Sequence, residues 1–179
     1  AGSCPASEVR RGVDVRMQER KGHAMKVRDL MTSDVEACRP DTDLAAVAKM
    51  MWDRDCGFMP VVDAAGTLRG VVTDRDICIA SATRRLLPEY MSANQLMTHP
   101  VHACLPDDGV SEALAAMKRF RVRRLPVIDM NGILKGVISI NDIVLAAERG
   151  AGPDAKEIVS TLAAICARRA FTPGTPAVA

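Results

Sequence analysis

The sequence has little of what several common protein classes require. Its 179 residues contain no apolar run near the ~20 residues of a membrane-spanning helix. The N-terminal stretch lacks the apolar core of a signal peptide. The six cysteines form no CxxC pair, and the three histidines show no metal-ligand spacing with them. We therefore expect a cytoplasmic protein with reduced thiols, no membrane attachment and no metal site.

The charge and the motifs exclude further classes. The net charge is only +2, too little to indicate nucleic-acid binding, which depends on clustered Lys and Arg. Hydrophobic residues make up 48% and charged residues 26% of the chain, which is typical of a globular protein. The sequence contains no Walker loop, no GxGxxG and no Ser-His-Asp arrangement. We therefore expect no enzymatic activity.

What the sequence does contain is an internal repeat. Shifted by 66 positions, residues 30–78 match residues 96–144 without a gap, and more than a third of the positions are identical. The phrase "GVVTDRDI" at 70–77 returns as "GVISINDI" at 136–143. Such a repeat indicates two copies of one structural unit.

Each copy has the same order of local signals. Short strands are expected at 35–38 and 101–104, ahead of a proline. Apolar residues at helical spacing then predict helices at 44–51 and 110–117, with Asp41, Thr42 or Asp43 as the cap of the first. Two strands around a Gly-containing turn and a second helix (74–82 and 140–148) follow. The unit is therefore β-α-β-β-α, and the predicted fold class is α+β with packed layers.

We divide the chain into five segments. These are an N-terminal extension (1–24), unit 1 (25–83), a linker (84–92), unit 2 (93–149), and a C-terminal helix with its tail (150–179). The C-terminal helix is expected to begin at Pro153 or Asp154 and to end near Arg168 and Arg169. It should pack on the pair or on a second subunit. Its apolar stripe comprises Ile158, Leu162, Ile165 and Cys166.

The repeated phrase places a hydroxyl residue and an aspartate at the start of a helix. Asp76 follows Thr73 by three residues, and Asp142 follows Ser139 in the same way. A carboxylate there could accept both hydroxyls of a ribose, beside helix N–H groups suited to phosphate. The same spacing is nearly a capping box, which stabilises a helix without any ligand. Both interpretations stay open at this point.

These features resemble a tandem pair of cystathionine-β-synthase (CBS) domains, here as a stand-alone pair. The resemblance covers about residues 26–148 and is carried by the unit order, the "LMT…V" opening and the closing Gly-x-x-[Ser/Thr]-x-x-Asp. It implies two units packed about a pseudo-twofold axis with two clefts between them. Many such pairs bind adenosine-containing ligands, so the resemblance implies an adenine nucleotide (AMP, ADP or ATP) or a relative such as S-adenosylmethionine. Such pairs also commonly form homodimers.

The resemblance also implies which residues line the clefts. Basic residues opening the second strand would hold phosphate, although Arg123 and Arg124 could instead lie on a solvated strand edge. Gly57 and Phe58 hold those places in unit 1, so the two clefts should differ. The implied ribose and phosphate contacts are Thr73, Arg75, Asp76, Ser139, Asn141, Asp142, Arg123 and Arg124. The implied base contacts are Thr32, Asp34, Val35, Thr98, His99, Val101, Phe58, Pro60 and Pro126.

Three functions fit the sequence. The first is a regulatory module that senses an adenosyl ligand and signals, through its conformation or dimer geometry, to an unknown effector protein. The second is a scaffold with the same fold and no ligand. The third is a thiol redox switch that uses Cys38, Cys56 or Cys104. Against the third, Cys38, Cys56, Cys78 and Cys104 are expected to be small core residues.

Overall fold

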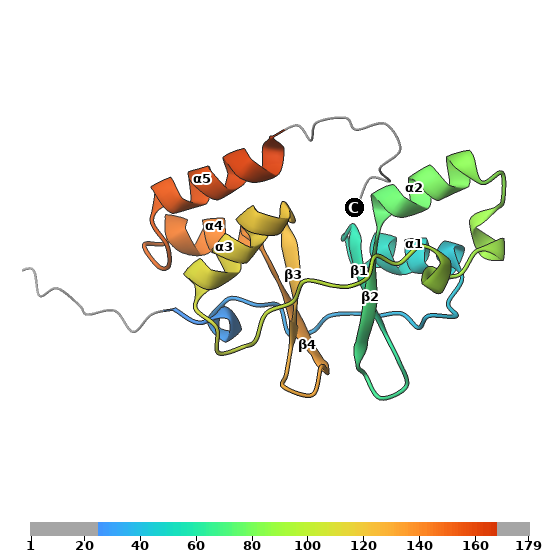
Figure 1. Cartoon of the computed structure of the whole chain (residues 1–179), viewed down its shortest axis with the longest axis horizontal. Helices are drawn as coiled ribbons and strands as arrows, with labels where there is room; N and C mark the ends of the chain where they lie inside the picture. The colour runs from blue at the N-terminus through green and yellow to red at the C-terminus, as the bar shows by residue number, and fades with distance from the viewer. Residues whose placement is uncertain (1–24, 168–179) are drawn as a thin grey trace, which may run out of the picture.

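A computed structural model of the chain describes residues 25–167 (Figure 1). Unit 1 contains the 3-10 helix η1 (Val27–Asp29), α1 (Leu44–Asp53), β1 (Phe58–Val62), β2 (Leu68–Thr73) and α2 (Asp74–Thr83). Two 3-10 turns follow, η2 (Pro88–Tyr90) and η3 (Ala93–Gln95). Unit 2 contains α3 (Val110–Phe120), β3 (Arg124–Ile128), β4 (Leu134–Ser139) and α4 (Ile140–Glu148), and α5 (Ala155–Cys166) comes last. The α+β class is confirmed.

The first helix of each unit forms where its apolar spacing predicted. Leu44, Val47 and Met51 are buried along one face of α1. Asp43 is the N-cap, and its side chain accepts a hydrogen bond from the backbone N–H of Ala46 at 2.8 Å. In α3 the buried residues are Val110, Ala113, Leu114 and Met117.

The two hairpins have the same register. In β1–β2, Phe58 pairs with Thr73 and Val61 pairs with Gly70. The β3–β4 hairpin repeats this pairing 66 residues later. Gly66 and Gly132 adopt positive φ angles of 81° and 79° in the two turns, a conformation that favours glycine. Each sheet therefore has two antiparallel strands, and the helices lie toward one end of the hairpins (Figure 1).

The prediction of strands at 35–38 and 101–104 is wrong. Each segment makes only a single parallel bridge, from Cys38 to Val61 and from Cys104 to Val127. The backbone N–H of Cys38 donates a hydrogen bond to the carbonyl of Pro60 at 3.0 Å. The next hydrogen bond of that parallel ladder would need an N–H from Pro60 itself. Proline has none, so the pairing stops after one residue. Pro126 has the same effect in unit 2, since Cys104 donates to its carbonyl at 3.1 Å.

The two units exchange their opening segments. Val27, from the start of unit 1, is buried in the core of unit 2, and its N–H donates to the carbonyl of Asp108 at 2.9 Å. Met91 and Ala93, from the linker and the start of unit 2, are buried in the core of unit 1. Ala93 N–H donates to the carbonyl of Thr42 at 2.9 Å. Burial of each opening segment therefore requires the other unit.

Helix α5 packs on α3 (Figure 1). Asp154 caps it by accepting a hydrogen bond from Glu157 N–H at 2.8 Å. Ile158 is buried in the core of unit 2, and Leu162 and Ile165 pack against that core. Cys166, expected in the same stripe, is exposed. Arg168 and Arg169 lie outside the described residues.

The cysteines divide into two groups. Cys38 and Cys104 are buried, as expected, and burial raises their thiol pKa values to about 11 and about 12. The expectation of burial is wrong for Cys78, which is exposed, and Cys56 is half-buried.

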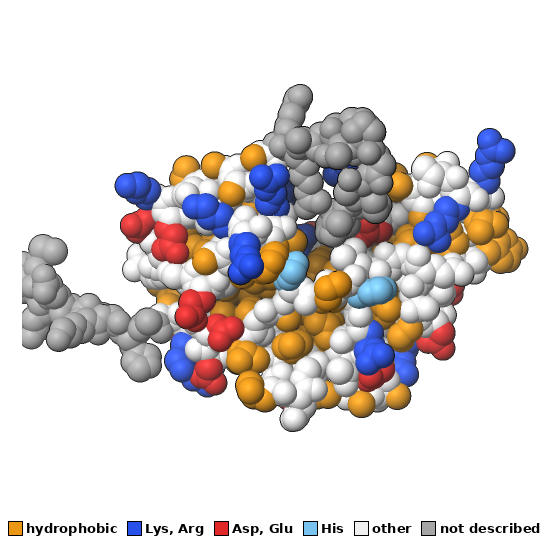
Figure 2. All heavy atoms as spheres, in the orientation of Figure 1, with side chains coloured by type: hydrophobic (Ala, Val, Ile, Leu, Met, Phe, Trp, Pro, Cys, Tyr) orange, Lys and Arg blue, Asp and Glu red, His pale blue; other side chains and the backbone are white. Residues whose placement is uncertain are grey.

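The lengths of the helices and the distribution of surface side chains address membrane insertion and surface charge. Among residues 25–167, no helix combines the length and apolar character that crossing a membrane requires. Figure 2 shows acidic and basic side chains interspersed around the edges of one face, with hydrophobic side chains gathered over its middle.

Candidate functional site

The repeated phrase forms two capping boxes. Ser139 is the N-cap of α4, and its Oγ accepts from Asp142 N–H at 3.2 Å. Asp142 Oδ2 in turn accepts from the Ser139 N–H at 2.8 Å and from the Ser139 hydroxyl at 2.7 Å. Thr73 and Asp76 repeat the arrangement on α2, with distances of 3.3, 2.9 and 2.7 Å. Each aspartate is thus held in place by its own helix start.

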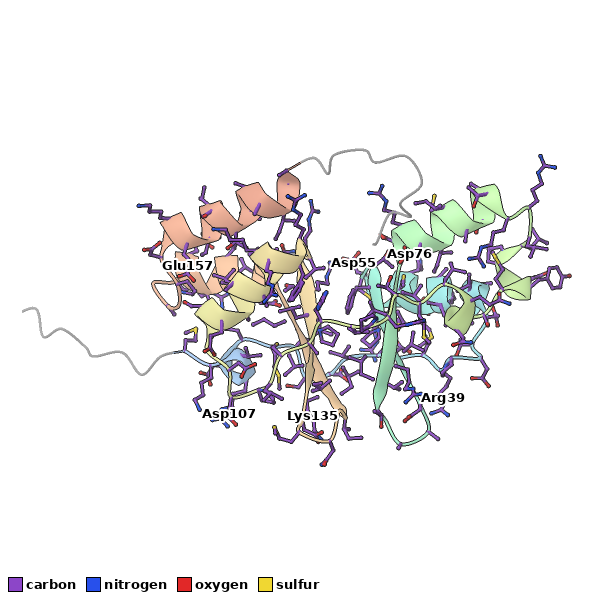
Figure 3. The ribbon with its side chains drawn as sticks, viewed as in Figure 1. Arg39, Asp55, Asp76, Asp107, Lys135 and Glu157 are labelled. Atoms are coloured by element: carbon purple, nitrogen blue, oxygen red, sulfur yellow. The ribbon has the colours of Figure 1, made fainter. Side chains whose placement is uncertain are left out.

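Capping engages only one oxygen of each carboxylate. Among residues 25–167, neither Oδ1 takes part in a hydrogen bond, whereas both Oδ2 atoms accept two. Asp76 and Asp142 are half-buried at the ends of the hairpins away from their turns, as Figure 3 shows for Asp76. A carboxylate oxygen that is fixed and still able to accept hydrogen bonds suits recognition of a hydroxyl group.

Asp142 lines a cavity of about 290 Å³ that is built from both units. Ser139, Arg124 and Val137 of unit 2 lie on its wall, together with Phe58 of β1. From the opening segment of unit 1 come four residues: Thr32, Asp34, Val35 and Glu36. Arg54 and Cys56, which follow α1, complete the lining.

A close backbone contact brings the two units together here. Thr32 N–H donates to Val137 O at 2.9 Å, and Val137 N–H donates to Thr32 O at 3.0 Å. Gly136 makes room for this contact, because a Cβ added there would lie 2.5 Å from Thr32 O. Thr98 and Val71 form the equivalent bridge on the other side of the pair. The opening segment of unit 1 is therefore fixed on β4, beside Ser139.

The cavity carries charges of both signs. Arg54 donates from Nε to Glu36 Oε2 at 3.0 Å, and its Nη1 lies 3.5 Å from Asp34 Oδ2. Hydrogen bonding to Glu36, with the nearby Asp34 charge, raises the pKa of Arg54. Arg124 is half-buried, and none of the ion pairs within residues 25–167 involves it. Its guanidinium can bind a phosphate in a bidentate manner.

The structure gathers many of the predicted contacts but not all. Arg123 and Asn141 are exposed and do not line this cavity. Pro60 and Pro126 are buried within β1 and β3 and do not line this cavity. The predicted residues that do line the cavity are Thr32, Asp34, Val35, Phe58, Arg124, Ser139 and Asp142.

The remaining predicted residues belong to the equivalent place on the other side of the pair. Thr98 is bonded to Val71, just before Thr73 and Asp76. Arg75 and His99 are exposed, and Val101 is half-buried. A second cavity, of about 490 Å³, lies between α1 and α2 and contains none of the predicted contacts.

Sequence reasoning missed four lining residues: Glu36, Arg54, Cys56 and Val137. For Glu36 and Arg54 a signal was available in the repeat. At a shift of 66 positions, Glu36 corresponds to His102 and Arg54 corresponds to Phe120. The acidic and the basic residue of unit 1 are therefore both replaced in unit 2. Such a joint change is what two residues in contact would show.

The side chains that line the cavity are suited to binding a ligand. It offers a fixed carboxylate, a hydroxyl, a guanidinium and an apolar wall. Among the described residues no group of His, Cys, Asp and Glu side chains could hold a metal ion. A polar ligand with an apolar ring fits such a mixture of groups.

Comparison with known proteins agrees with the fold. The profile of the CBS domain family matches residues 27–83 and 93–149. An uncharacterized 17.7 kDa protein of Acidianus ambivalens is 32% identical over 123 residues, which cover 69% of this chain and 73% of that protein.

Two solved structures are similar. The CBS domain pair of protein MJ0100, in complex with 5'-methylthioadenosine and S-adenosyl-L-methionine, has a TM-score of 0.65 and 21% identity over 71% of this chain and 98% of that one. CBSX2 in complex with AMP has a TM-score of 0.61 and 25% identity over 69% and 96% of the two chains. The family match covers both halves of the repeat, so this chain belongs to the CBS domain family, with two CBS domains in tandem.

Proposed function

We propose that the chain is a regulatory module that binds an adenine nucleotide or a related adenosyl compound between its two CBS units. AMP, ADP, ATP and S-adenosylmethionine are the candidate ligands. The observation that carries the proposal is the position of Asp142, which lines the cavity between the units while its Oδ2 is fixed by Ser139. In this proposal Asp142 Oδ1 accepts a ribose hydroxyl, and Arg124 with the start of α4 binds a phosphate.

Relatives with the same fold support the ligand class. CBSX2 was crystallised with AMP, and the MJ0100 pair with two adenosyl compounds. In this chain the base would contact Val35 and Phe58, the apolar residues of the cavity wall. The base, sugar and phosphate would then each face groups of suitable chemistry.

The proposed output is a change in the arrangement of the two units. The ligand would touch Thr32 and Val35 of unit 1 and Ser139 and Asp142 of unit 2. It would therefore favour one relative arrangement, provided that it binds the alternatives unequally. We propose that a homodimer in the cytoplasm transmits this change to an effector protein, without a catalytic step.

Calorimetry tests the proposal. The protein would be titrated with AMP, ATP, S-adenosylmethionine and NADH, at concentrations that detect micromolar binding. Saturable heat from at least one adenosyl ligand is expected. Heat from none of the four would contradict ligand sensing.

The second candidate is a scaffold that binds no ligand, and one observation favours it. The capping boxes give Asp76 and Asp142 a structural role in the free protein. The same titration separates the two candidates, because a scaffold gives no heat with any of the four compounds.

A further inference from the structure

The two CBS units carry different side chains at a pair of positions that the repeat makes equivalent. In unit 1, Glu36 and Arg54 form an ion pair that lines the cavity. At the same positions of unit 2, His102 and Phe120 stack with ring centroids 3.4 Å apart and planes 9° from parallel. Asp34 of the first side corresponds to Pro100 of the second. One wall is therefore charged where the other is aromatic.

The charges around the cavity leave a negative excess. Among the described residues, three carboxylates line it, from Asp34, Glu36 and Asp142, against the two guanidinium groups of Arg54 and Arg124. Arg54 is already engaged by Glu36 and Asp34. Among the described residues that line the cavity, Arg124 is then the one guanidinium left for a ligand phosphate. Each further phosphate group would add repulsion from the carboxylates.

The ion pair of Glu36 and Arg54 is partly exposed to solvent, as is the neighbouring Asp34. The exposed fractions of the side chains are 34% for Glu36, 50% for Arg54 and 90% for Asp34. Ion pairs exposed to this extent contribute little to folding stability. Replacement of Glu36 should therefore leave the fold unchanged and act mainly on the charge that a ligand meets.

We infer that Glu36, by holding Arg54, makes this cavity select adenosyl ligands with at most one phosphate over the di- and triphosphates. This inference rests on the proposed function and narrows its ligand class. Glu36 occupies the guanidinium that a second or third phosphate would otherwise bind, and adds a negative charge beside it. Its duplicate position, His102, exerts no comparable repulsion, because an imidazole side chain carries no negative charge.

The test compares phosphate preference in matched variants. Adenosine, AMP, ADP and ATP would be titrated calorimetrically into the wild-type protein, Glu36→Gln and the control His102→Gln. In Glu36→Gln we expect affinity for ATP to rise by about tenfold or more relative to adenosine, because a like charge has been removed and Arg54 keeps only its longer ionic contact, with Asp34 at 3.5 Å. His102→Gln should leave that ratio unchanged. The double variant Glu36→Gln, Arg54→Gln should lose most of the gain.

The outcomes separate this inference from the proposed function. If the ligands bind and the ratio of ATP to adenosine affinity is the same in Glu36→Gln as in the wild type, the inference is overturned and the proposed function stands. A wild-type preference for ATP over AMP would also overturn it. If neither these four ligands nor S-adenosylmethionine, titrated alongside them, binds any of the proteins, both fail. Circular dichroism of each variant establishes that its fold is intact.

Discussion

Gly136 faces the Thr32 carbonyl so closely that a Cβ added to the glycine would lie 2.5 Å from that oxygen. The obstacle is backbone, held by two hydrogen bonds between Thr32 and Val137, so it cannot move aside cheaply. We expect Gly136→Ala to lower the free energy of unfolding by about 1–3 kcal/mol, the usual range for overpacking. Chemical denaturation measures this loss.

Gly109→Ala is the matched control. A Cβ at Gly109 would meet nothing closer than Glu112 Oε2 at 3.5 Å, an ordinary contact. Its cost should not exceed about 1 kcal/mol, since Gly109 is a helix N-cap and alanine is a poorer one. Equal losses in the two variants would contradict the close approach of the units at Gly136.

Arg124 and Arg123 are neighbours with different surroundings. Arg124 lines the cavity, whereas Arg123 is exposed outside it. Arg124→Ala should weaken binding of AMP more than binding of adenosine, because a guanidinium contacts phosphate and not the nucleoside. Arg123→Ala should change neither affinity. Equal effects of the two substitutions in calorimetry would remove the assigned role of Arg124.

Asp129 stabilises the turn of the second hairpin. Its Oδ1 accepts hydrogen bonds from Ile133 N–H at 3.0 Å and Asn131 N–H at 2.9 Å, and its Oδ2 lies 3.1 Å from Lys135 Nζ. The Ile133 bond is the main cause that lowers the pKa of the carboxyl below its ordinary value of 3.8. The stabilisation is therefore present above that ordinary value and lost as the pH falls through the lowered pKa.

Asp129→Ala should accordingly reduce stability near neutral pH, and the difference from the wild type should shrink in strong acid. Thermal unfolding followed across pH measures the difference. A gap between the two proteins that does not change with pH would show that the ionised carboxylate is not the stabilising form.

The exposed and buried thiols should differ in reactivity. Burial raises the pKa of Cys38 and Cys104, so few thiolates form there, while Cys78 and Cys166 are exposed. Iodoacetamide should modify Cys78 and Cys166 in the native protein, and the buried pair only after unfolding. Peptide mass spectrometry reads this out. Native modification of Cys38 or Cys104 as fast as Cys78 would support the thiol-switch alternative.

Local signals made much of the fold predictable. The spacing of Leu44, Val47 and Met51 indicated α1, and the duplicated Ser/Thr-x-x-Asp indicated the starts of α2 and α4. These elements depend on residues close in sequence, so periodicity and capping suffice. The failed strands at 35–38 and 101–104 show the limit, since their pairing depended on the missing N–H of a proline in a distant strand.

Contacts between the units could not be predicted in the same way. Nothing in the sequence near Val27 indicates that it is buried in unit 2, because burial there follows from packing of the whole pair. The pairing of Glu36 with Arg54 joins an opening segment to a helix end 18 residues later. The family resemblance supplied the general place of the cleft and part of its lining, whereas the Glu36–Arg54 ion pair on its wall was identified in the structure.

The measurement that tests the account most directly is the affinity of Asp142→Ala for AMP, with Asp76→Ala beside it. A hydrogen bond to a charged group contributes about 1.5–3 kcal/mol, so we predict that Asp142→Ala binds AMP several-fold or more weakly while still unfolding cooperatively. AMP affinities equal to that of the wild type in both variants would contradict the assignment of these aspartates to ligand binding.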